Sequence, residues 1–133
     1  MSCGAACVRQ ILLDAGIHVP EAKIRELAGF HPVFGIWADG VASALEKLHA
    51  GQRYVATSVD LGSAGLLFRC APFIALLGKH WVIIDRVEVK LVYVRDPAGL
   101  PGSDGAVGVE GVLRREIFDD RWLRGIHQAV FRR

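Results

Sequence analysis

The spacing of apolar residues changes near residue 52, and this change limits the folds that the chain can adopt. Before it, apolar residues recur at the intervals of an amphipathic helix, as at Val8, Ile11, Leu12 and Ala15. After it, the pattern consists of short apolar runs and alternating stretches, which are typical of β-strands. A chain with its helices first and its strands afterwards is predicted to be an α+β protein with an antiparallel sheet.

The predicted elements follow from this pattern and from the glycines and prolines that interrupt it. Helices are expected at 4–15, 20–28 and 37–49, each followed by a glycine that can end it, with a loop at 30–36. Strands are expected at 54–59, 73–77, 80–85 and 89–95, with a short helix at 63–70. The segment 100–111 is expected to be a loop, and the apolar residues after it are expected to pack back on the body.

The bulk composition restricts the class of protein. A chain of 133 residues is predicted to form a single domain over residues 1–133. The formal charge of +2 gives no electrostatic argument for binding nucleic acid. We find no signal peptide and no membrane span, and three cysteines without a disulfide framework indicate free thiols in a reducing, cytoplasmic compartment.

Three residues that suit nucleophilic chemistry lie where the predicted elements would bring them together. Cys3 opens the first helix, where free backbone N–H groups and the helix dipole favour a thiolate. His80 begins one strand of a predicted hairpin and Asp96 ends the other, so the two are expected to be close. The pattern therefore predicts a thiolate at Cys3, an imidazole at His80 that exchanges a proton with it, and a carboxylate at Asp96 that orients the ring.

Other interpretations of these residues stay open at this point. Taken singly, Cys3 could be a small apolar residue, His80 a surface histidine and Asp96 part of a turn. Cys3, Cys7, His80 and Asp96 could together bind a metal, although cysteines four apart on a helix are not typical of structural zinc sites. Cys7 is expected to pack on the sheet, and Cys70 to lie in the core.

Several stretches together resemble a known family. The chain contains, in this order, Cys-Gly-Ala-Ala-Cys, Gly-Lys-His-Trp-Val-Ile-Ile and Val-Tyr-Val-Arg-Asp-Pro-Ala, followed by Phe118, Trp122 and Gly125. This arrangement resembles the papain-like cysteine peptidases that process bacteriocin precursors at double-glycine leaders. The resemblance implies a papain-like fold, no cofactor or metal, and cleavage next to small residues such as Gly-Gly. It also implies Cys3 as the nucleophile, His80 as its base and Asp96 as the orienting residue.

The start of the chain departs from the family's pattern. Ser2 stands where the family usually has an acidic residue, and no glutamine precedes Cys3 to supply a side-chain donor to the oxyanion hole. The expected partner is a peptide or protein substrate, in the context of a transporter or of a larger effector. In the second case the chain would be the toxin domain of a secreted bacterial effector, inhibited by an immunity protein. A noncatalytic peptide-binding domain is a further alternative.

Overall fold

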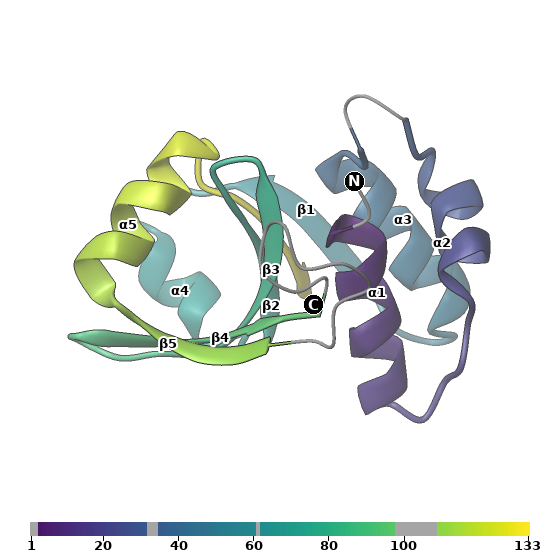
Figure 1. The fold of residues 1–133 in the computed structure, drawn as a ribbon, viewed down its shortest axis with the longest axis horizontal. Coiled ribbons are helices and arrows are strands. Elements are labelled where there is room, and N and C mark those ends of the chain that lie inside the picture. Colours follow the sequence, from purple (N-terminus) through teal and green to yellow (C-terminus); the bar gives the residue numbers. More distant parts are fainter. Residues whose placement is uncertain (1–2, 32–34, 61, 98–108) are drawn as a thin grey trace.

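A computed structural model describes residues 3–31, 35–60, 62–97 and 109–133. A six-stranded antiparallel sheet has helices on both of its faces, with the N-terminal helices on one side (Figure 1). The helices are α1 (Cys3–Asp14), α2 (Glu21–Ala28), α3 (Ala38–Leu48), α4 (Ala64–Phe68) and α5 (Arg115–Arg124). The strands are β1 (Tyr54–Ser58), β2 (Phe73–Leu77), β3 (His80–Val87), β4 (Leu91–Asp96), β5 (Val109–Arg114) and β6 (Gln128–Arg132).

The order of the strands in the sheet is β1-β6-β2-β3-β4-β5. Strands β2 to β5 are neighbours in sequence order, whereas β6 lies between β1 and β2 and pairs with both. The predicted α+β class and its papain-like arrangement of helices and antiparallel sheet are confirmed.

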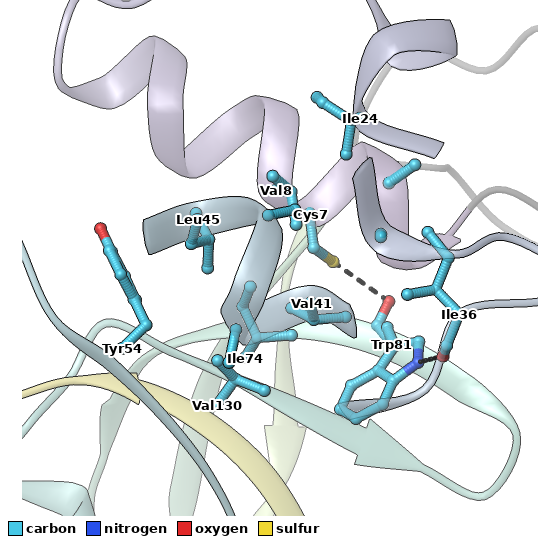
Figure 2. Close-up of a cluster of buried hydrophobic side chains, with 14 of the residues drawn as sticks. Cys7, Val8, Ile24, Ile36, Val41, Leu45, Tyr54, Ile74, Trp81 and Val130 are labelled. Carbon is cyan, nitrogen blue, oxygen red and sulfur yellow. Dashed lines mark hydrogen bonds between the residues drawn. The ribbon is translucent and has the colours of Figure 1, made fainter. Parts of the chain in front are cut away.

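Each face of the sheet carries its own core because side chains alternate along a strand. In β3, Trp81 and Ile83 belong to the core beneath α1, α2 and α3, while Val82 and Ile84 belong to the core on the face of α4 and α5. A strand buried on both faces has a continuous apolar run, which is the pattern of this segment. Figure 2 shows the first core, where helix residues meet residues from the sheet.

Helix α1 lies against this first core along most of its length. Its buried residues are Cys3, Gly4, Ala5, Ala6, Cys7, Val8 and Leu12. Small side chains in the first two turns allow the helix backbone to approach β3 closely. The predicted helix is therefore confirmed, and its burial is greatest at the end that begins with Cys3.

Several boundaries differ from those that the pattern predicts. Strand β2 has the predicted bounds, but β3 continues two residues further than expected, to Val87. Residues 109–111 belong to β5 rather than to a loop, and the rest of the segment 100–111 lies outside the described residues. In the described part of the chain, no helix is long and apolar enough to cross a membrane.

Candidate active site

Helix α1 places Cys3 against the start of β3. Cys3 is the first residue of the helix and is largely buried. The next residue, Gly4, lies so close to neighbouring side chains that an added Cβ would be 3.2 Å from Cδ1 of Trp81 and 3.4 Å from Cβ of Ile36. A glycine here thus lets the first turn of the helix rest directly on the strand that carries His80.

The hairpin of β3 and β4 brings His80 and Asp96 together. His80 is the first residue of β3 and Asp96 is the last residue of β4, so antiparallel pairing places them at the same end of the hairpin. Their side chains form a hydrogen bond of 2.6 Å between Nε2 of His80 and Oδ2 of Asp96. The adjacency that the sequence predicts for these two residues is present in the structure.

The thiol of Cys3 and the imidazole of His80 are also hydrogen-bonded to each other. The imidazole therefore lies between a thiol and a carboxylate. The structure brings together all three of the residues that the sequence predicts for the site.

These contacts shift the ionisation of both partners. Burial of Cys3 acts to raise the pKa of its thiol, but the hydrogen bond with His80, backbone N–H donors at Trp81 and Gly4, and the positive charge of His80 lower that pKa below its ordinary value. The hydrogen bond to Cys3 is the main cause that raises the pKa of His80, to about 9, with Asp96 adding to it against the opposing effect of burial. Both shifts favour a thiolate beside an imidazolium.

Trp81 connects the helix, the strand and the loop before α3. Its backbone N–H acts to lower the pKa of Cys3, and its carbonyl accepts a hydrogen bond of 3.4 Å from Sγ of Cys7. Its indole Nε1 donates to the carbonyl of Ile36 at 3.0 Å, as Figure 2 shows. Sequence reasoning did not predict the role of the Trp81 backbone, because a main-chain donor has no signature in the residue pattern.

The other cysteines lie in different surroundings. Cys7 is fully buried in the core, as expected, and burial raises the pKa of its thiol well above the ordinary value, the opposite direction from Cys3. Cys70 is half-buried, so the prediction that it lies in the core is wrong. Within the described residues, no group of His, Cys, Asp and Glu side chains has the arrangement of a metal site.

Asp96 is buried, whereas the His80 side chain beside it is 31% exposed. The Oδ1 atom of Asp96 is buried and has no hydrogen-bond partner among the described residues, whereas Oδ2 accepts the bond from His80.

A cavity of about 550 Å³ lies at the far end of α1 beside Asp14, His49 and Tyr54. It contains neither Cys3 nor His80, so cavity size does not locate this site.

The family model of the peptidase C39 family matches residues 1–124. The chain belongs to this family. The predictions of a cysteine peptidase and of its relation to the bacteriocin-processing peptidases are confirmed. A comparison with curated proteins finds no significant match.

Solved structures with the same fold include two peptidase domains. A double glycine motif protease from an AMS/PCAT transporter, solved in complex with the leader peptide, is similar with a TM-score of 0.74 and 20% identity, over 98% of this chain and 83% of that one. The peptidase domain of Streptococcus ComA, a bifunctional ABC transporter involved in quorum sensing, has a TM-score of 0.74 and 23% identity, over 98% of this chain and 90% of that one. At these identities the likeness concerns the fold.

Proposed function

We propose that the peptidase cleaves a peptide bond with Cys3 as nucleophile, His80 as general acid and base, and Asp96 as the residue that orients the ring. The observation that supports this proposal most directly is the position of the His80 imidazole between the thiol and the carboxylate. The opposite pKa shifts of Cys3 and His80 add to it, because they favour the ion pair that a cysteine nucleophile requires.

The proposed reaction proceeds in two steps. The thiolate of Cys3 attacks the carbonyl carbon of the scissile bond, and the protonated His80 donates its proton to the leaving amine, which leaves a thioester on Cys3. Water then attacks the thioester while His80 accepts a proton, and the thiolate is regenerated. The proposal assigns the backbone N–H of Cys3, in the first turn of α1, as a donor to the oxyanion.

The proposed substrate is a peptide or protein cut next to small residues such as Gly-Gly. The support for this choice is family membership together with the similar double glycine motif protease that was solved with a leader peptide. We infer that residues 1–133 act as one domain in a reducing cytoplasmic compartment, since a free nucleophilic thiol is maintained there. In this first setting, in which the chain processes leader peptides, its partner protein would be a transporter.

The alternative setting is a toxin domain of a secreted effector, inhibited by an immunity protein. It uses the same three residues and differs in its substrate. A peptide containing Gly-Gly after an amphipathic helix distinguishes the two settings: a leader peptidase cleaves it after the glycines, whereas a toxin cleaves proteins of a target cell and leaves this peptide intact. Mass spectrometry of the products identifies the cut bond.

The assignment of the nucleophile is tested with two cysteine variants. Cys3→Ala should abolish cleavage and leave the fold intact, because the side chain is small and lies at a helix start. Cys7→Ala, the matched control one helical turn away, should keep most of the activity because the Cys7 thiol is protonated and bonded to a backbone carbonyl. Cleavage rates and circular dichroism are measured for both. Equal loss of activity in the two variants would exclude Cys3 as the single nucleophile.

A further inference from the structure

An arginine next to Asp96 links the far end of α1 to the hairpin that carries His80. Arg95 binds Asp85 through Nε at 2.7 Å and through Nη2 at 2.9 Å. It binds Asp14, the last residue of α1, through Nη1 at 3.1 Å and through Nη2 at 2.9 Å. One guanidinium thus uses all three of its nitrogens to hold two carboxylates, each by two contacts.

The local backbone explains why these three side chains meet. Arg95 pairs with Ile83, whose side chain lies in the core beneath α1, so Arg95 is on the face of the sheet that α1 covers. The register of β3 and β4 shifts between Ile84 and Arg86, which leaves Asp85 as the additional residue of a bulge. The bulge places the carboxylate of Asp85 beside the guanidinium.

The link is more enclosed than an ordinary surface ion pair. The Arg95 side chain is 18% exposed, whereas Arg86, which pairs with Glu88 in the same hairpin, is 62% exposed. Exposed ion pairs contribute little to stability, but a bidentate arginine–carboxylate pair, which has two hydrogen bonds, fixes the relative orientation of the two side chains. Gln10 donates a further hydrogen bond of 3.0 Å to Asp14, so the carboxylate at the end of α1 is held from two sides.

We propose that Arg95 is a positioning residue that sets the orientation of α1, and through it the place of Cys3 relative to His80; this inference rests on the proposed function of those two residues. The twelve-residue helix is about 18 Å long, so a rotation of about 6° around its middle moves its first residue by nearly 1 Å. A displacement of about that size between reacting groups is sufficient to cost about 100-fold in rate.

The positive charge of Arg95 also acts on a cysteine in the first half of α1. Its positive charge lowers the pKa of Cys7, one turn from Cys3 on α1, against the larger effect of burial. The hairpin supplies His80 and Asp96, and the helix supplies Cys3. Arg95 is bonded to the helix through Asp14 and to the hairpin through Asp85 at the same time.

The test follows the ionisation of Cys3 in variants that break one arm of the link at a time. Thiolate absorbance is titrated against pH in the wild type, Arg95→Met, Asp14→Asn and Asp85→Asn, with Cys3→Ala as the blank. Arg86→Met is the matched control, because it removes an arginine from the same hairpin without touching α1. His80→Ala gives the full shift that results from loss of the ion pair.

The expected result is an upward shift of the titration midpoint in Arg95→Met and in Asp14→Asn that reaches at least half of the shift in His80→Ala. A double variant with Arg95→Met and Asp14→Asn should show no larger shift than the larger of the two single shifts, because both substitutions remove the same link. Arg86→Met should titrate as the wild type does, and Asp85→Asn should shift less than Asp14→Asn because the bond to the helix is retained. A merely structural loss would reduce the folded fraction and leave the midpoint unchanged.

Two outcomes would overturn the inference. If the wild type titrates as His80→Ala does, the proposed function fails and this inference fails with it. If the wild type depends on His80 but Asp14→Asn and Arg95→Met both keep its midpoint, the inference alone is wrong. Should Arg95→Met fail to fold, as judged by near-ultraviolet circular dichroism, Asp14→Asn decides the question, since its carboxylate is 38% exposed.

Discussion

Removing the imidazole of His80 should change the ionisation of Cys3 by an amount that the structure allows us to work out. The pKa of His80 rises from 6.5 to about 9, which corresponds to a factor of about 300 in the equilibrium for its proton. Cys3 and Asp96 both contribute, and the bond to Cys3 is the largest contribution. If Cys3 accounts for about half of the shift on a logarithmic scale, its share is a factor of about 20.

Coupling between two sites is reciprocal, so a protonated His80 favours the thiolate of Cys3 by the same factor of about 20. In His80→Ala the thiolate population near neutral pH should therefore fall about 20-fold. The rate of alkylation by iodoacetamide should fall less, by about fivefold, because a thiolate of higher pKa is intrinsically more nucleophilic. Burial of Cys3 remains in the variant and acts in the same direction as the loss of the imidazole.

The assay measures both quantities on the same protein. Intact-mass spectrometry gives the rate of single labelling by limiting iodoacetamide, and thiolate absorbance gives the population. Cys3→Ala serves as the control, since any labelling that remains in it comes from the half-buried Cys70 or from Cys7. Equal rates and equal thiolate populations in the wild type and in His80→Ala would refute the reasoning, because the hydrogen bond would then contribute nothing to the ionisation of Cys3.

Two further predictions concern the carboxylate of the site and the packing of the sheet. Asp96→Asn keeps a hydrogen-bond acceptor but removes the negative charge beside His80. Since His80 is protonated below about pH 9 in the wild type, its pKa should be lower in the variant. An NMR titration of the ring protons of His80 measures this pKa, and an unchanged midpoint would contradict the prediction. Gly125→Ala should destabilise the fold by about 1–3 kcal/mol, because the added Cβ would lie 2.1 Å from the carbonyl oxygen of Leu76. Gly65→Ala is the control, because no atom lies near a Cβ added at this position in α4; it should be neutral or stabilising by up to about 1 kcal/mol. Denaturant unfolding measures both variants. Equal effects of the two substitutions would show that the close approach of Gly125 to Leu76 is unimportant.

The parts of the fold that depend on local pattern could be predicted from the sequence. Strand β2 is a continuous apolar run between interrupting residues, and its predicted bounds agree with the structure. The proximity of His80 and Asp96 could be predicted because a short turn determines which ends of a hairpin meet. These inferences need only the residues of one or two neighbouring elements.

The parts that depend on distant contacts could not be predicted. Gly111 lies inside β5, where a glycine-rich segment favours a loop, and the pairing of β5 with β4 overrides that preference. The position of β6 between β1 and β2 has no signal within residues 128–132. Arg95 and Asp14 were equally undetectable as a pair, because 81 residues separate them and each alone is typical of a solvated surface.

The central position of β6 determines when the peptidase can become complete during synthesis. Residues 128–132 leave the ribosome after every other strand, yet β1 and β2 have no direct pairing and are joined only through them. Until then β1 is a single strand separate from the group β2 to β5, and pairing of β1 with the distant β6 forms slowly. The helix that carries the thiol therefore meets a complete sheet only after residues 128–132 have emerged.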